Sequence, residues 1–529
     1  MERQSPHRLV EALEHRIRPL EIEFHRAYWD SQVDVTPENE RRRAELELEL
    51  RRVKGDPDAL RAVTAALDDG ANDPLLRRQL EVLRLSLTGN QMDEAKREQV
   101  VALSTSLESD FAAYRPELDG QRLSDNDIER ILKTSDDADL RRRSWEASKE
   151  VGGVVADRVR ELARLRNATA HDLGYADYYG MALDLQELEE GWLFGILDDI
   201  ERRTDEPFRR WKSELDARLA RRFQTDELYP WHYADPFFQQ LPPDGKVSLE
   251  PLLADASAPD LAARWFERIG IDLSGVMGAS DLYPRERKSQ HAFCMDVDRS
   301  GRDVRILANV VPGERWTEVM LHESGHAAYD VSIDPRVPYL LHRPPHTFVT
   351  EAIAILSGRR LHDPRWLVEV GELAPDDVAS IEEPLRRAPA AASLLFARWV
   401  LVVVHFERDL YLDPESDLDA RWWELVERFQ LVRRPEGRSA PDWAAKVHIA
   451  AAPAYYQNYL LGEMLASQIE HTCEREGASL VDGTAAGEWL TERVFRPGSS
   501  KRWDAVVEHA TGRGLSADDF AADLAPAVP

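Results

Sequence analysis

The sequence contains little cysteine and no long hydrophobic run. Only Cys294 and Cys473 occur in 529 residues, which excludes a disulfide framework and makes a reducing compartment the simplest interpretation. No run of about 18 apolar residues occurs, and the amino terminus has no apolar segment of signal-peptide length. We therefore expect a cytoplasmic protein that has no membrane partner.

Positive charge is also scarce. The chain has 68 basic and 97 acidic residues, a formal net charge of −29, and a pI near 5.0. Such a protein repels polyanions, so nucleic acid is not an expected partner. Nine of the 68 basic residues are lysines and the rest are arginines, so each lysine merits attention. We expect a monomer or a homodimer.

The first half of the chain shows helical periodicity. Apolar and charged residues alternate at three- and four-residue spacing over residues 7–29, 39–53 and 90–114, as amphipathic helices require. Proline and glycine gather at residues 229–245 and 433–443, which predicts two long loops. We find no internal repeat and no linker that divides the chain, so we expect a single domain over residues 1–529.

One segment departs from this helical pattern. Residues 290–312 contain two runs of strand character around a polar turn at Asp298 to Asp303. The pattern predicts a β-hairpin. Its first strand places His291, Phe293 and Met295 on one face, because side chains alternate along a strand. The alternative is a hairpin that only packs against its neighbours.

The chemically informative stretch is LHESGH at residues 321–326. His322 and His326 stand four residues apart in a segment predicted to be helical from about Gly313 to Val331, so both imidazoles project from one face. Glu323 lies beside them. Zinc held by three protein ligands keeps an open position for water, and a neighbouring carboxylate can take that water's proton. The alternative is a pair of hydrogen-bonded core histidines.

The third ligand is not fixed by this motif. A further histidine six residues after His326 would define the metzincins, but Ser332 occupies that position and excludes them. Glu351 is the one carboxylate in an apolar helical stretch, where an unpaired charge would be too costly. We favour Glu351, with His342 and His346 as alternatives.

The second half of the chain resembles a known family. WWELVERFQ (422–430) and AKVHIAAAPAYYQNYLLGE (445–463), together with QHAFCMDV and HESGH, are similar to the angiotensin-converting-enzyme-like peptidyl-dipeptidases. These gluzincins are zinc peptidases that remove dipeptides from carboxyl termini. The thimet oligopeptidases and oligoendopeptidases share the fold and are the second resemblance. The likeness extends over most of the chain.

This resemblance implies a role for each matching residue. His322, His326 and Glu351 would bind one zinc ion per chain, with Glu323 as general base. His448 and Tyr459 match the family's pair that stabilises the oxyanion. Lys446 and Tyr456 match the two residues that grip the substrate's free carboxylate, and His291 and Ala292 match the pair that binds the substrate backbone. Hydrogen-bond donors aimed at developing negative charge contribute about 3 to 4 kcal/mol each.

The sequence departs from the family at several positions. The chloride-binding arginine after Trp-Trp-Glu-Leu is Val426, and the arginine before the second tyrosine is Asn458, which makes chloride activation doubtful. Thr350 and Ile355 replace the histidine and aspartate of the family's His-Glu-Ala-Ile-Gly-Asp segment. No aspartate is therefore available there to orient a ligand histidine. The family's carboxylate-binding glutamine has no clear counterpart. Tyr455 is the alternative to Tyr456 as the tyrosine that grips the substrate's free carboxylate.

We therefore expect a mainly α-helical ellipsoid with a deep central cleft, a zincin-type active-site helix and a small β-hairpin beside it. Helices in about residues 1–120 would form a lid, and about residues 285–470 the catalytic core. The predicted function is release of carboxy-terminal dipeptides from short peptides. The alternatives are an oligoendopeptidase, a non-catalytic helical protein with structural zinc, and a zinc enzyme acting on a peptide-like metabolite.

Overall fold

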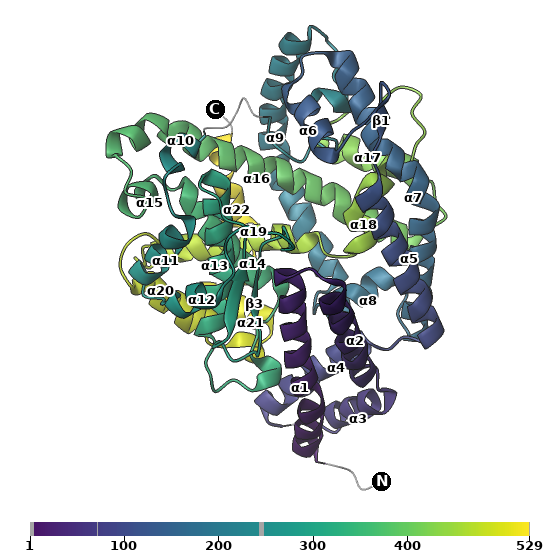
Figure 1. Ribbon diagram of the computed structural model, residues 1–529, viewed down its shortest axis with the longest axis vertical. Helices are drawn as coiled ribbons and strands as arrows, with labels where there is room; N and C mark the ends of the chain where they lie inside the picture. The colour runs from purple at the N-terminus through teal and green to yellow at the C-terminus, as the bar shows by residue number, and fades with distance from the viewer. Residues whose placement is uncertain (1–4, 71, 243–247, 528–529) are drawn as a thin grey trace. The chain divides into compact units, whose positions relative to one another are not determined.

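The structure is a computed structural model that describes residues 5–70, 72–242 and 248–527. It is 69% helical, and the described residues contain two small two-stranded sheets. The prediction of a mainly α fold with a small hairpin is thus confirmed. Figure 1 shows the helices and the hairpin strand β3 along the chain.

Two compact units, each discontinuous in sequence, make up the chain. Unit 1 consists of Met1–Gln91, Ser248–Glu382 and Leu461–Phe520, and unit 2 of Met92–Val247, Glu383–Leu460 and Ala521–Pro529. Three helices contribute residues to both units: α16 (Pro375–Leu412), α19 (Gln457–Arg475) and α22 (Asp518–Asp523). The prediction of a single domain stays a prediction.

The remaining elements of unit 1 are α1 (Pro6–Val33), α2 (Pro37–Lys54), α3 (Pro57–Asp68), α4 (Pro74–Thr88), α10 (Glu250–Leu253), α11 (Ala258–Arg268), α12 (Ser274–Ala279), β3 (Phe293–Asp296), β4 (Val304–Leu307), α13 (Glu314–Ser332), α14 (Thr347–Gly358), α15 (Pro364–Glu369), α20 (Ala485–Leu490) and α21 (Trp503–Thr511). Those of unit 2 are α5 (Glu94–Ala113), β1 (Glu117–Leu118), β2 (Gln121–Arg122), α6 (Asp125–Thr134), α7 (Ala138–Asp172), α8 (Tyr178–Leu185), α9 (Glu190–Phe223), α17 (Leu418–Gln430) and α18 (Val447–Ala451).

The amino-terminal helices of unit 1 form one apolar cluster. Leucine, valine, isoleucine and alanine side chains of α1 to α4 pack together with Tyr339 and Leu340. Proline at the first turn and a Ser, Thr or Asp N-cap begin each helix, because those residues satisfy its free N–H groups. Burial of these apolar faces holds the helices together.

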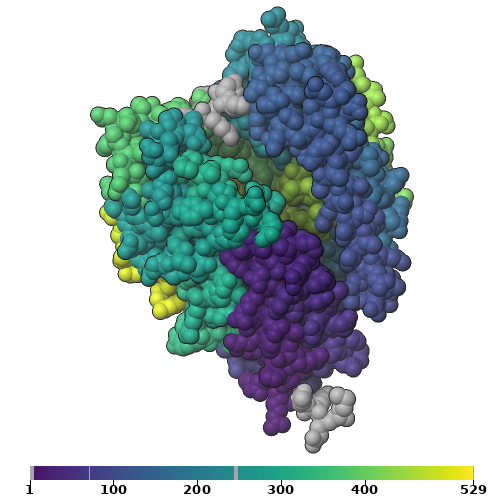
Figure 2. Space-filling model, in the orientation of Figure 1, coloured from purple at the N-terminus to yellow at the C-terminus, as the bar shows by residue number. Residues whose placement is uncertain are grey.

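The predicted hairpin is present, and α1 packs against it. β3 and β4 pair antiparallel with Phe293 opposite Leu307, and the ring of Phe293 contacts Tyr28 and Trp29 of α1. Figure 2 shows the purple surface of the amino-terminal helices beside the teal residues of this region. The strand begins at Phe293, so His291 and Ala292 lie just before it, within the 290–312 segment that the sequence indicated.

An ion network links α1 and α2 to the hairpin turn. The Glu21 carboxylate, 3% exposed, lies 2.5 Å from Lys54 and 3.2 Å from Arg299, and accepts the Tyr339 hydroxyl at 3.0 Å. Burial opposes the charged form of Glu21, but these cations and hydrogen bonds outweigh it and lower its pKa to about 2.

The other predicted elements agree with the structure where it describes them. The three amphipathic segments of the first half fall in α1, α2 and α5. Residues 229–242 and 433–441 are loops, apart from one short 3-10 turn at Pro230–His232, whereas residues 442–443 of the second predicted loop begin the 3-10 helix Asp442–Ala445. Residues 243–245 of the predicted 229–245 loop lie outside the described residues. Within the described chain, α16 is long and apolar enough to cross a membrane by length and composition, and 78% of its 18-residue window is buried, as in a core helix.

Candidate active site

Two helices of unit 1, α13 and α14, carry the candidate metal ligands. They pack closely because position 325 is glycine: a Cβ there would lie 2.7 Å from Ser357 Oγ, 2.8 Å from Ala354 Cα and 2.9 Å from Ile353 O. Any larger residue would push α14 away from α13. The small residues of LHESGH thus permit the helix contact. Figure 1 shows α13 and α14 side by side, with β3 next to them.

This contact brings the three predicted ligands together. The nearest ligand atoms of His322, His326 and Glu351 all lie within 4.8 Å of one another, and His322 Nε2 is 3.7 Å from Glu351 Oε2. The two imidazole rings are nearly perpendicular, with centroids 5.1 Å apart. Two imidazoles and one carboxylate are the donors of many catalytic zinc sites.

The two histidines that were alternatives to Glu351 lie outside the cluster of three. His346 is the N-cap of α14, where its Nδ1 accepts the Phe348 N–H at 3.1 Å. His342 is 4% exposed, and its Nδ1 lies 3.9 Å from Asp296. Neither belongs to the cluster of three, so the geometry favours Glu351 as third ligand.

A threonine forms a hydrogen bond with one of the candidate ligand histidines. His326 Nδ1 lies 2.7 Å from Thr350 Oγ1, on the residue before Glu351. Because Nδ1 is engaged by this hydrogen bond, Nε2 is the nitrogen left for a metal. The sequence showed that the family's aspartate is missing, and Thr350 is the residue that replaces it as hydrogen-bond partner.

Burial favours the neutral form of every ionisable group at the cluster. It lowers the pKa of His322 to about 4; burial and then the charge of His322 lower the pKa of His326 to about 3. Burial raises the pKa of Glu351 to about 7, and burial together with Glu351 raises that of Glu323 to about 8. Neutral imidazoles are the metal-binding form. Two buried carboxyl groups without a cation are unfavourable as anions, so this donor set fits a divalent metal.

Glu323 lies between the ligands and the hairpin. It is 7% exposed, and its carboxylate accepts the backbone N–H of Cys294 in β3. Among the described strands, β3 pairs with β4 alone, which leaves one edge for a peptide in extended conformation. His291, which is exposed, and Ala292 precede that edge. Burial raises the pKa of the Cys294 thiol well above its usual value, consistent with a small apolar side chain.

Unit 2 contains the other candidate residues, and they lie near one another. Lys446 is 8% exposed and donates to Gln239 Oε1 at 3.0 Å, with its ammonium 5.2 to 5.6 Å from the rings of Trp399, Phe237 and Tyr456. Burial lowers the pKa of Lys446 to about 8. This lysine is therefore held in an aromatic cage and is not a solvated surface residue.

Gln239 is a residue that the sequence did not identify. It lies in the loop before residue 243, whose conformation is fixed by buried Asp235: the Asp235 carboxylate accepts the N–H groups of Phe237, Gln239 and Gln240, each at 2.9 Å. A glutamine side chain beside a buried ammonium can bind a carboxylate together with it. No local signal marked Gln239, because its partner is 207 residues away.

One short segment, residues 448–459, contains His448, Tyr456 and Tyr459. The rings of His448 and Tyr456 are 5.4 Å apart, and those of Tyr456 and Tyr459 are 5.6 Å apart. Burial and then the charge of Lys446 lower the pKa of His448 to about 4, so its imidazole is neutral at pH 7 and carries one N–H. Tyr456 contacts Lys446, and its ring is 4% exposed, which favours it over Tyr455 as the residue beside the ammonium.

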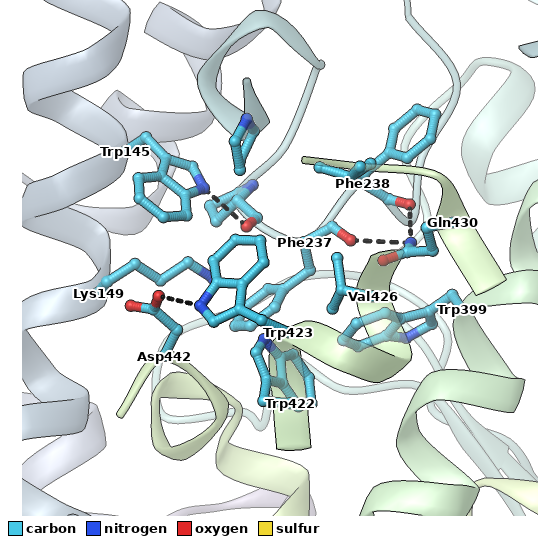
Figure 3. A pocket seen from close by; sticks show the side chains of 13 residues that line it. Trp145, Lys149, Phe237, Phe238, Trp399, Trp422, Trp423, Val426, Gln430 and Asp442 are labelled. Carbon is cyan, nitrogen blue, oxygen red and sulfur yellow. Dashed lines mark hydrogen bonds between the residues drawn. The ribbon is translucent and has the colours of Figure 1, made fainter. Parts of the chain in front are cut away.

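Val426, which replaces the family's arginine, lines a pocket within unit 2. Figure 3 shows the pocket walls, which include four tryptophans and two phenylalanines. Lys149 also lines this pocket, and its ammonium lies 3.2 Å from the centroid of the Phe237 ring. Burial lowers its pKa to about 7. Nearby Asp442 is paired with Arg438 and accepts the Trp423 indole N–H.

A mainly helical protein with an HExxH helix, a following glutamate and an adjacent edge strand has the features of a metallopeptidase. Comparison with known families agrees with this class. The sequence model described as angiotensin-converting enzyme (peptidase family M2) matches residues 2–206, and that of peptidase family M3 matches residues 277–526. Both predicted resemblances are confirmed, and the two matches support a metallopeptidase acting on peptides.

One curated relative matches a shorter stretch. It is an inactive angiotensin-converting enzyme-related protein of Caenorhabditis elegans, 27% identical over 106 residues, which are 19% of this chain. The match spans only 12% of the length of that relative, so its properties do not transfer to the whole chain.

Proposed function

We propose that this protein is a zinc-dependent peptidase that releases dipeptides from the carboxyl ends of short peptides. The observation that carries the dipeptidase assignment is the caged ammonium of Lys446 beside the Gln239 amide oxygen. Among the described residues Lys446 forms no ion pair, although the Asp235 carboxylate attracts it, so the terminal carboxylate of a substrate would supply a direct partner for the buried ammonium. In this proposal, the carboxyl terminus of the substrate therefore lies beside Lys446 and Gln239.

In this proposal His322, His326 and Glu351 hold one zinc ion. Zinc, when bound, supplies a Lewis acid that polarises the scissile carbonyl and acidifies water. Glu323 takes a proton from the attacking water and later gives it to the leaving amine, so the proton balance closes within one turnover.

The remaining residues bind the peptide and stabilise charge. His448 and Tyr459 donate hydrogen bonds to the oxyanion that develops on the scissile carbonyl. Lys446 and Tyr456, with Gln239, bind the terminal carboxylate. His291 and Ala292, just before β3, bind the peptide backbone by strand addition. Chloride activation is not part of the proposal, because Val426 and Asn458 stand where the family has arginine.

An oligoendopeptidase remains the second candidate. The match of residues 277–526 to peptidase family M3 favours it, because that segment includes the proposed zinc ligands. A non-catalytic protein is a third candidate, and the name of the nematode relative is the observation in its favour. The intact Glu323 argues against it, because a structural zinc site has no use for an adjacent base.

The deciding experiment compares one peptide with its carboxy-amidated twin. A dipeptidyl carboxypeptidase cleaves the free acid and leaves the amide nearly intact, whereas an oligoendopeptidase cleaves both equally. Lys446→Met, which keeps the apolar contacts of the stem, should reduce kcat/KM for the free acid about 10- to 100-fold, the range of a charge-assisted hydrogen bond. Lys501→Met, at an exposed lysine, is the matched control. Equal cleavage of both peptides by the wild type would refute the dipeptidase assignment.

A further inference from the structure

The segment between His448 and Tyr459 contains an unusual backbone conformation. Ala454 has φ of +52°, in the left-handed region that residues with a Cβ rarely adopt. Its side chain is fully buried. A buried alanine in this region persists only when its surroundings hold it there. Because Tyr456 follows two residues later, the backbone at Ala454 sets the direction in which the chain enters α19.

Several side chains hold this segment from different helices of unit 2. The Ala454 carbonyl accepts Gln186 Nε2 at 3.0 Å and Gln457 Nε2 at 2.5 Å. Arg166 of α7 donates to the Ala450 carbonyl at 2.9 Å. The Ala454 N–H donates to Glu407 Oε1 at 3.1 Å, and Glu407 comes from the long helix α16.

Glu407 is the acidic residue of this set, and it is completely buried. It is 0% exposed, and its Oε2 has no hydrogen-bond partner among the described residues. Burial raises its pKa to about 8, against the opposing effects of the Ala454 N–H and Arg166, so the carboxyl is largely neutral at pH 7. A buried carboxylic acid with one oxygen lacking a hydrogen-bond partner destabilises the fold. Its presence here therefore indicates that its one hydrogen bond, from the Ala454 N–H, has a structural role.

We propose that Glu407 is a positioning residue, which fixes Ala454 in its left-handed conformation and so orients the segment that carries His448, Tyr456 and Tyr459. Glu407 does not touch substrate; it acts through the backbone of residue 454. The inference concerns the proposed catalytic and carboxylate-binding groups, and for its effect on activity it rests on the proposed function. Its structural claim stands on the contacts at Ala454.

The first test measures the backbone directly and needs no activity. Hydrogen–deuterium exchange of a peptide covering residues 450–459 should be at least about tenfold faster in Glu407→Ala than in the wild type, because the Ala454 N–H loses its buried acceptor. Glu407→Gln, which keeps an acceptor oxygen of the same shape, should stay near the wild type. Phe208→Leu, a core change on α9 whose ring contacts Trp211 and Arg398, controls for general loosening of unit 2. Unchanged exchange in Glu407→Ala would overturn the proposal.

The second test links position to activity. Glu407→Ala should lower kcat/KM about tenfold or more, and Ala454→Gly in the same chain should restore part of it, because glycine adopts positive φ without being held. A merely structural role would lower the thermal midpoint as Phe208→Leu does, with no rescue by glycine, and that result would also overturn the proposal. A wild type that cleaves no peptide, together with faster exchange in Glu407→Ala, would refute the proposed function and leave the positioning role standing.

Discussion

Thr350 offers a sharp test of the metal centre. Thr350→Val replaces the hydroxyl with a methyl group of similar size and removes the acceptor 2.7 Å from His326 Nδ1. The helix packing between α13 and α14 is unchanged, because Val and Thr have nearly the same shape. What changes is the orientation of one ligand imidazole and the hydrogen bond that fixes its tautomer.

The expected magnitude follows from the environment of His326. Leaving a buried polar group without its partner costs about 1 to 3 kcal/mol. Loss of such an outer partner reduces metal affinity about 10- to 100-fold, which corresponds to about 1.4 to 2.7 kcal/mol and agrees with that range. We therefore expect the zinc dissociation constant of Thr350→Val to rise by one to two orders of magnitude.

Competition with a fluorescent chelator measures zinc affinity without reference to catalysis. The matched control is Thr347→Val, an exposed threonine at the start of the same helix, for which we expect no change. Circular dichroism verifies that both variants fold. If Thr350→Val binds zinc as tightly as the wild type, then the hydrogen bond does not orient a ligand and His326 is not held as we describe.

Two further predictions concern catalysis and acid stability. Glu323→Gln should retain zinc and fold but lose at least about 100-fold in turnover, since a general base typically contributes 10²- to 10⁴-fold; unchanged turnover would favour a non-catalytic protein. The pKa of Glu21 falls from 4.5 to about 2 on folding, so its ion network adds stability that is present above pH 4.5 and lost as the pH falls toward 2. At pH 7, Glu21→Gln should thus lower the free energy of unfolding by an amount on the order of 3 kcal/mol and lower the thermal midpoint accordingly; near pH 2 its midpoint should converge with that of the wild type. The control is Glu23→Gln, at an exposed residue, and a difference between Glu21→Gln and the wild type that is constant at all pH values would contradict this account.

Helical periodicity predicted most of the fold, because it depends on neighbours three and four residues apart. The active-site helix was expected from about Gly313 to Val331 and is found at Glu314–Ser332. The hairpin was expected within residues 290–312 and pairs Phe293–Asp296 with Val304–Leu307. The division into two compact units was not anticipated, because discontinuous segments leave no linker in the sequence.

The sequence by itself predicted that His322 and His326 lie on one face, since two histidines four apart on a helix must share a face. It also pointed to Glu351, through the cost of an unpaired carboxylate in an apolar helix. Only the tertiary structure decided the partner of His326, the caging of Lys446 with Gln239 and the left-handed backbone of Ala454 held by Glu407. Each of these depends on groups 24 to 207 residues apart in sequence, and local spacing carries no information about which distant side chains packing will bring together.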